Sequence, residues 1–161
     1  MFLGTVYVSR GKLGMKGLAE EALSIGQDRL MLLDRWKGAP GKIMLYTLVP
    51  NIKLHFPIVY LSSATTQMEL GNVPRVRTPA QSIVIESSDS EVQLLAEALG
   101  EFVGMKKLER AETGTNANYM SFGDAKTHVA MMTFRRFPEQ TEIGPRLVVR
   151  HLAWSEKSDE S

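Results

Sequence analysis

The stretch Ile83–Val103, with the sequence IVIESSDSEVQLLAEALGEFV, decides the fold class. Its β-branched start predicts a strand over Ile83–Glu86. Ser88 and Glu91 then have the spacing of a capping box, in which a hydroxyl and a carboxylate satisfy free amides at a helix start. The apolar residues that follow recur at helical spacing and predict a helix over Asp89–Val103: Val92, Leu95, Leu99 and Phe102. A strand that leads directly into an amphipathic helix is typical of an α/β fold.

The same order of strand and helix occurs earlier in the chain at one offset. Val6 lies 77 residues before Ile83 (83 − 6 = 77), and the string Leu18–Leu23 lies 77 residues before Leu95–Leu99 (95 − 18 = 77). The same shift carries two further strands onto later ones: Ile43–Thr47 close to Tyr119–Phe122, and Leu54–Tyr60 onto Met131–Phe137. We therefore predict an α/β (α+β) fold made of two similar β-α-β-β-β halves. The alternative is chance, because Leu-Ala-Glu-Ala-Leu is a common helical composition and short strands align easily.

These halves set the expected organisation of residues 1–154 as one domain. The first half covers about 4–62 and the second about 82–154, joined by a polar connector over about 63–81. Residues 155–161 are expected to form a flexible tail. A length of 161 residues fits this single domain.

Composition and spacing predict the remaining elements. Thr5–Val8 is β-branched and aromatic, as strands are, and apolar residues from Met15 to Ile25 predict a helix that stops at Gly26. From Ile52 to Ile58 apolar residues alternate, and Pro57 within this run indicates an edge strand or a bulge. Further strands are predicted at Leu30–Leu33, Lys42–Leu48, Tyr119–Phe122, His128–Arg136 and Arg146–Trp154.

Composition excludes several classes of protein. There is no cysteine, which removes disulfides, thiolate nucleophiles and cysteine metal sites. No apolar run approaches the length of a membrane span, and the first residues do not resemble a signal peptide. We therefore expect a soluble, cytoplasmic protein that does not act on a membrane.

Motifs for catalysis and cofactors are also missing. Gly11–Gly17 follows a predicted strand and opens a helix, but its spacing fits neither a dinucleotide fingerprint nor a P-loop. His55, His128 and His151 have no ligand partner at metal spacing. Because no nucleophile motif appears either, we predict a non-enzymatic protein without metal or cofactor.

The cations occur in pairs, although the net charge is only +1. Each cation that neutralises a phosphate adds affinity for nucleic acid, so pairs gathered on one face would form an RNA-binding surface. The alternative is an ordinary solvated surface. The pairs are Arg10/Lys12, Arg35/Lys37, Arg75/Arg77, Lys106/Lys107 and Arg135/Arg136.

Aromatic residues near these cations are candidates for stacking on unpaired bases. Trp36 belongs to the loop Arg35–Lys42, which combines an aromatic residue, three cations and a Gly-Ala-Pro-Gly turn. The indole of Trp36 could equally fold back as a plug of this loop. Phe134 and Phe137 are weaker candidates, since strand alternation places Phe134 beside Ala130 and Met132 on an apolar face.

Four short motifs resemble the archaeal Brix-domain proteins: Ser9–Lys12, Asp34–Gly41, Tyr119–Phe122 and Glu142–Arg146. In that family an Arg-Gly turn leads into a helix, a strand and an Arg-rich Gly-Asn-Pro-Gly loop, and a Glu-Ile-Gly-Pro-Arg signature follows an Ile-Ser-Phe strand. The resemblance implies a two-half fold related to the anticodon-binding domain of some aminoacyl-tRNA synthetases. It also implies a role in ribosome biogenesis through binding of ribosomal RNA or its precursor.

The expected RNA-binding residues combine the paired cations with the motif residues: Arg10, Lys12, Arg35, Trp36, Lys37, Arg75, Arg77, Arg135, Arg136 and Arg146. The expected partners are ribosomal RNA or its precursor, ribosomal proteins and other assembly factors. The alternative function is a protein-interaction scaffold in ribosome assembly that makes little contact with RNA.

Two departures from the family pattern matter. Ala39 stands where the family usually has Asn, and the strand, Ser-Arg-Lys-Pro-Ser-like turn and Arg-rich helix that normally begin the domain are not seen before Thr5. The sequence therefore represents a shortened member or one whose start was placed too far downstream. A lost strand and helix would uncover a sheet edge and an apolar face, which invites self-association.

Overall fold

The computed structural model describes residues 5–36, 38–71, 79–108, 118–137 and 139–156. It contains the following elements in chain order: α1 (Met15–Ser24), β1 (Arg29–Trp36), β2 (Ala39–Thr47), β3 (Lys53–Thr65), β4 (Ala80–Ile85), α2 (Ser90–Val103), β5 (Lys106–Leu108), β6 (Asn118–Ala125), β7 (His128–Arg136) and β8 (Thr141–Ala153). The predicted α/β (α+β) class is confirmed, with eight strands and two helices in the described part of the chain.

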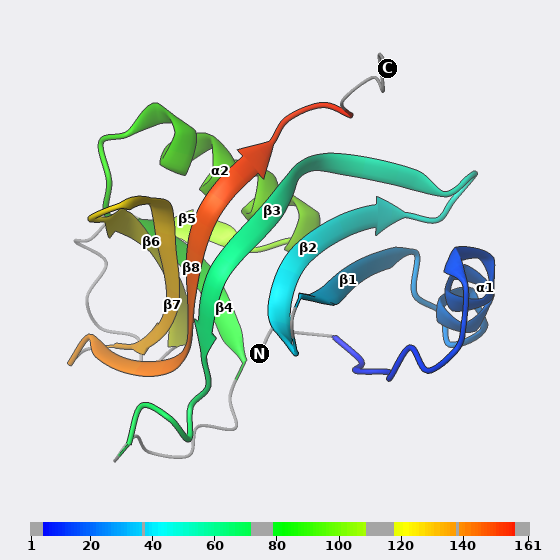
Figure 1. The fold of residues 1–161 in the computed structure, drawn as a ribbon, viewed down its shortest axis with the longest axis horizontal. Coiled ribbons are helices and arrows are strands. Elements are labelled where there is room, and N and C mark those ends of the chain that lie inside the picture. The colour runs from blue at the N-terminus through cyan, green and yellow to red at the C-terminus, as the bar shows by residue number, and fades with distance from the viewer. Residues whose placement is uncertain (1–4, 37, 72–78, 109–117, 138, 157–161) are drawn as a thin grey trace.

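All eight strands form one strongly curled sheet, in the order β1-β2-β3-β8-β7-β6-β4-β5 (Figure 1). The strand β4 pairs in parallel with both β5 and β6, and every other pair is antiparallel. The middle of the sheet is the pairing of β3 with β8, in which Tyr60 lies opposite His151. Strands from the two halves of the sequence therefore meet in a shared centre.

The helix α2 lies on the concave face of the sheet and supplies much of the core. Its Val92, Leu95 and Ala96 are fully buried among residues of both halves of the sheet, such as Leu45 and Phe122. Burial of this kind contributes on the order of 2 kcal/mol for each large aliphatic side chain.

Both ends of α2 are fixed by local interactions. The predicted helix is confirmed within one residue, but its cap is Asp89 instead of Ser88, because the Asp89 carboxylate accepts hydrogen bonds from the Glu91 and Val92 amides at 2.8 and 3.3 Å. At the other end Gly104 adopts a left-handed conformation with φ of 73°. There Arg29 of β1 donates to the carbonyl of Phe102 at 2.5 Å, which ties the first half of the sheet to the helix.

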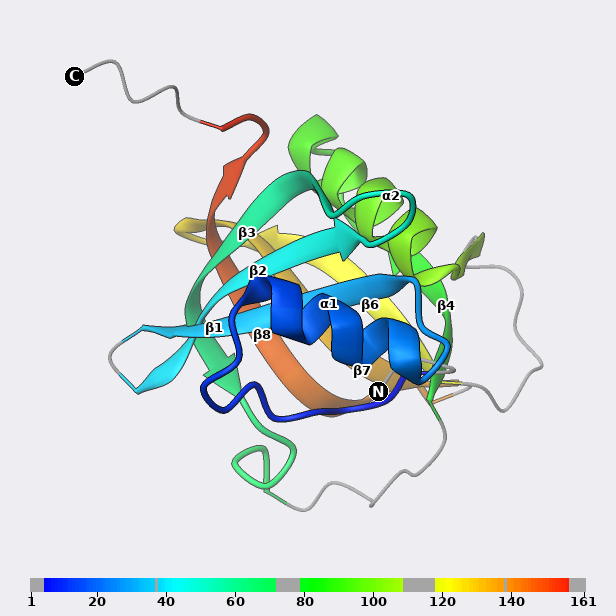
Figure 2. The same cartoon turned by 90° about the vertical axis from the view of Figure 1, so that its right-hand side faces the viewer.

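The helix α1 packs on the opposite face of the sheet from α2 (Figure 2). Its Ala19 and Ala22 are buried against Leu48, with Leu30 and Tyr46 alongside. Met31 follows Leu30 on β1, and Leu45 precedes Tyr46 on β2. Because successive side chains of a strand point to opposite faces, Met31 and Leu45 belong to the core that α2 fills.

The sheet order changes how the two halves correspond. Strands at equivalent positions on either side of the β3–β8 pair are β1 and β6, β2 and β7, and β3 and β8. Their first residues differ by 89, 89 and 88 (118 − 29, 128 − 39 and 141 − 53). The offset of 77 residues thus relates only buried positions of the two helices, such as Leu18 of α1 and Leu95 of α2. These two helices cover opposite faces of the sheet.

Three local predictions are corrected. Thr5–Val8 is not a strand, and Tyr7 is 91% exposed: strand propensity depends on packing context, so β-branched and aromatic composition alone does not produce a strand. The bulge expected at Pro57 is present as a register shift, but β3 is a central strand, and its buried side chains are Pro57, Val59 and Leu61 instead of Leu54, Phe56 and Ile58. The expected connector begins later, because β3 continues to Thr65.

Candidate nucleic-acid interface

The loop Arg35–Lys42 is the tip of the β1–β2 hairpin instead of an open loop. Arg35 pairs with Pro40 and Trp36 with Ala39, and the bulge beside Asp34 leaves Gly41 as the extra residue of β2. The turn follows the pairing of Trp36 with Ala39 and includes Gly38, which has the positive φ, 81°, that such tight turns require. Arg35 is exposed at this tip. Lys37 and the side chain of Trp36 lie outside the described residues.

The equivalent turn of the second half, between β6 and β7, also carries a cation. Ala125 pairs with His128, so the turn consists of Lys126 and Thr127, both exposed. Sequence reasoning missed Lys126 because the offset of 77 matched the first hairpin with a different segment.

Arg10 and Lys12 lie in the turn that leads into α1. The Arg10 Nε donates to the Leu13 carbonyl at 3.0 Å, and the Leu13 amide donates back to the Arg10 carbonyl at 3.1 Å. This closed turn places Gly11 at φ 56° and leaves both cations exposed. Arg10 retains part of its guanidinium for a ligand, since Nε is only one of its donor nitrogens.

Arg135 and Arg136 are neighbours on β7 with different environments. Arg135 is half-buried and its Nη1 donates to the Gln140 carbonyl at 3.0 Å. Arg136 is exposed. Of this pair, Arg136 is the residue whose position suits a phosphate contact.

Arg146 forms a bidentate ion pair with Glu142 on β8. The distances Nε–Oε1 and Nη2–Oε2 are both 2.6 Å, and Thr133 Oγ1 donates to Glu142 Oε1 at 2.8 Å. The hydrogen bonds from Arg146 hold the pKa of the Glu142 carboxyl below its ordinary value of 4.5; partial burial opposes this effect and Thr133 adds to it. The same pair raises the pKa of the Arg146 guanidinium. Arg146 is thus largely engaged within the protein.

The phenylalanines considered for base stacking belong to the core. Phe134 and Phe137 are each 3% exposed, and Phe137 stacks on Tyr119 with ring centroids 4.1 Å apart. Because both residues are buried, neither ring presents a face on which a base could stack. Arg75 and Arg77 lie outside the described residues.

A further cluster was not found from the sequence. Tyr60 lies between Lys42 and His151 in the strand register, and Arg150 approaches the same ring. The stretches that supply these residues are 91 residues apart (151 − 60), so only the β3–β8 pairing brings them together. No local pattern in the sequence could have indicated this.

Other kinds of site find little support. Within the described ranges, no three His, Asp or Glu side chains gather in a way that could hold a metal ion. None of the described helices is long and apolar enough to span a bilayer.

Comparison with known proteins finds no matching family model. It does find curated relatives over nearly the whole chain. The "probable Brix domain-containing ribosomal biogenesis protein" of Thermococcus kodakarensis is 27% identical over 164 residues, which span 93% of this chain and 78% of the relative. The protein of the same description from Pyrococcus abyssi is 25% identical over 93% of this chain and 73% of its own. This chain is a relative of the archaeal Brix-domain proteins.

Solved structures show that the Brix-type fold is shared as well. A probable ribosomal biogenesis protein from Aeropyrum pernix matches with a TM-score of 0.72 at 20% identity, over 92% of this chain and 82% of that one. Mil, an archaeal Imp4-like protein, matches with a TM-score of 0.62 at 14% identity, over 96% and 85% of the two chains.

The structure also gives the Brix-like motif Glu142–Arg146 a physical role. Gly144 has a positive φ of 67° near the start of β8, and a Cβ there would lie 2.6 Å from Leu70 Cδ1. The register between β7 and β8 shifts here, because Thr133 pairs with Arg146 and Arg135 with Glu142, and β8 bends at this glycine. Glu142 and Arg146 on either side form the ion pair described above. The motif is therefore a structural device of β8.

Proposed function

We propose that this protein is a non-enzymatic ribosome biogenesis factor that acts in the cytoplasm by binding ribosomal RNA or its precursor. The observation that carries the proposal is the likeness to proteins described as ribosomal biogenesis proteins over 93% of the chain. The exposed cations at the turns of the fold support RNA as the ligand: phosphate contacts from Arg and Lys provide most of the affinity in such complexes.

The described cations among the expected RNA-binding residues divide into two groups. Arg10, Lys12, Arg35 and Arg136 are exposed and remain the preferred phosphate contacts. Arg135 and Arg146 are held by Gln140 and Glu142, so we assign them a smaller share of the RNA affinity. Lys37, Arg75 and Arg77 stay in the proposed site on sequence grounds alone.

The test measures affinity for a structured ribosomal RNA fragment over a range of salt concentrations. Affinity should fall steeply with salt if cations act on phosphates. Replacing Arg35, Trp36 and Lys37 together by Ala should weaken binding and reduce the salt slope by about 1.5, since each lost phosphate contact removes roughly 0.7–0.9 from it.

The matched control replaces Lys126 and Thr127, which occupy the equivalent turn of the second half, by Ala. The salt slope of this variant should fall by no more than the contribution of one phosphate contact. Unchanged affinity in the triple variant, with a folded protein, would remove the β1–β2 hairpin from the RNA site.

A protein-interaction scaffold is the second candidate function. It is favoured by the outer edge of β1, which has no strand partner among the described residues, and by Leu33 on that strand, which is 49% exposed. Edge strands of this kind pair readily with another chain. RNA binding that is absent or insensitive to salt, combined with capture of purified ribosomal proteins, would favour this candidate over RNA binding.

A further inference from the structure

A row of polar and aromatic residues runs from the β1 edge of the sheet to its centre, on the face away from the core that α2 fills. Asp34 lies opposite Lys42, Lys42 opposite Tyr60, and Tyr60 opposite His151, so the row runs from β1 through β2 and β3 to β8. The core-facing neighbour Val59 is 1% exposed, and strand alternation turns Tyr60 to the other face. This face is the one that α1 covers elsewhere, through Tyr46 of β2.

Tyr60 is the centre of this row. The Lys42 Nζ lies 5.9 Å and the Arg150 Cζ 5.5 Å from the centroid of its ring. The His151 ring lies 5.6 Å away at a tilt of 36°. Two aromatic rings are thus flanked by two cations that come from different halves of the sequence.

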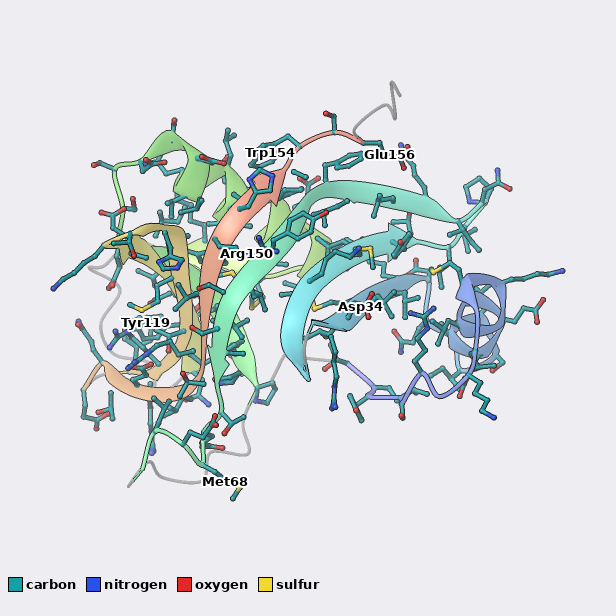
Figure 3. All side chains as sticks on the ribbon, in the orientation of Figure 1. Asp34, Met68, Tyr119, Arg150, Trp154 and Glu156 are labelled. Carbon is teal, nitrogen blue, oxygen red and sulfur yellow. The ribbon has the colours of Figure 1, made fainter. Side chains whose placement is uncertain are left out.

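The rings border a hollow of about 510 Å³ at the end of the β3–β8 pair. Ile58, Tyr60, Arg150, His151 and Ala153 line it. Glu156, which follows the end of β8, also lines the hollow; Figure 3 labels it together with Arg150 of β8. Small-molecule sites are commonly about 300–1,000 Å³, so the hollow has room for one nucleotide unit.

The core does not need this combination of residues. Arg150 and His151 are exposed, and Lys42 and Tyr60 are half-buried. An aromatic platform with adjacent cations is the arrangement by which proteins bind single-stranded nucleic acid: the base stacks on the ring and the cations meet the backbone. Base stacking is also stronger than an exposed cation–π contact, so a base can replace a cation on the ring and free it for phosphate.

We propose that the hollow is a subsite for one unpaired nucleotide of the bound RNA. The base stacks on Tyr60 and His151 against the apolar wall of Ile58 and Ala153. Its phosphates lie over Lys42 and Arg150, at a distance from the Glu156 carboxylate, which repels them. The inference rests on the proposed function, because it assigns part of the RNA contact to the face of the central strands in addition to the turns.

The test uses fluorescence anisotropy with a labelled, unstructured single-stranded RNA and with a fully paired duplex of the same sequence. Tyr60→Ile should weaken binding of the single strand about tenfold, since one stacked base is lost, and leave its salt slope unchanged. Arg150→Ala should reduce the slope by about 0.7, the effect of one phosphate contact on a single strand. Duplex affinity should change little in Tyr60→Ile, because its bases are paired and stacked.

Two variants serve as controls. Tyr60→Phe keeps the ring and should bind as the original protein does. Tyr7→Ile removes an exposed tyrosine outside the sheet and should have no effect. If Tyr60→Ile does not fold, His151→Ala and Arg150→Ala carry the test, since both side chains are exposed.

The outcomes separate the subsite from the proposed function. If the protein binds structured ribosomal RNA but Tyr60→Ile, His151→Ala and Arg150→Ala leave single-strand affinity unchanged, the subsite is wrong and the proposed function stands. If the original protein binds no RNA, both the subsite and the proposed function are wrong. Loss of binding to a purified ribosomal protein in these variants, with RNA binding intact, would identify a protein contact and overturn the subsite.

Discussion

Glu142 and Arg146 are four residues apart on one strand and nevertheless form two hydrogen bonds of 2.6 Å. In a straight strand four residues cover about 13 Å. The bend at Gly144, with its φ of 67°, lies between the two residues and turns one toward the other. The ion pair and the glycine thus act as one unit, and this unit also holds Thr133 of β7.

Removal of this ion pair should destabilise the fold more than it weakens RNA binding. We expect a coupling free energy of about 1 kcal/mol between Glu142→Gln and Arg146→Gln, at the upper end for surface pairs because the contact is bidentate and Glu142 is mostly buried. A double-mutant cycle in urea measures it. Arg146→Lys should be less stable than the original protein, since Lys cannot form the two parallel hydrogen bonds that the Arg guanidinium donates to Glu142. Additive effects of the two substitutions would contradict the coupling.

The same pair predicts how stability depends on pH. The pKa of Glu142 is lowered in the folded state, so its stabilising contribution is full above the ordinary value of 4.5 and disappears as the pH falls through the lowered folded value. The difference in unfolding free energy between the original protein and Glu142→Gln should therefore shrink on acidification from pH 7. A difference that stays constant or grows toward low pH would contradict the lowered pKa.

Gly144→Ala should cost about 1–2 kcal/mol of unfolding free energy, because an L side chain is strained in the left-handed conformation and the new Cβ meets Leu70. The matched control is Gly123→Ala on β6, where a Cβ meets nothing within 4 Å. That control should be nearly neutral. Denaturant unfolding of both variants is the measurement, and equal stabilities would refute the role assigned to Gly144.

The open edge of β1 predicts self-association that grows with protein concentration. Leu33→Lys should suppress it, since a charge on an edge strand opposes pairing with a second copy. Leu94→Lys provides the control: Leu94 is similarly exposed, 52% against 49% for Leu33, but lies on α2. Sedimentation velocity gives the oligomeric state, and a monomer at every concentration would end this prediction.

Local signals made part of the fold predictable. The limits of α2 were predicted within one residue, because its regularly spaced apolar residues and the polar residues that begin the helix lie within one short segment. The strand β7 was predicted with its observed limits, His128–Arg136. In contrast β5 has three residues, too few for any periodicity, and it depends on parallel pairing with β4. The failure at Thr5–Val8 has the same origin, since residue type alone does not provide a partner strand.

The site was less predictable than the fold. Arg35 and Lys12 are exposed, as a phosphate contact requires, because turns between strands and helices are at the surface; their contact with RNA stays a prediction. The ion pair of Arg146 with Glu142 could not be predicted from the sequence, since that contact depends on the bend of β8. The contact between Tyr60 and His151 could not be predicted for a related reason: it depends on the register of two strands from opposite halves of the sequence.

The pairing of β3 with β8 also determines when the proposed nucleotide subsite can exist during synthesis. The strand β8 follows the other seven strands in sequence but takes a central place in the sheet. While the ribosome is still making the chain, the β1–β2 hairpin can form from neighbouring residues, whereas Tyr60 must wait for His151. A prematurely terminated polypeptide would therefore display the basic hairpin without the aromatic platform.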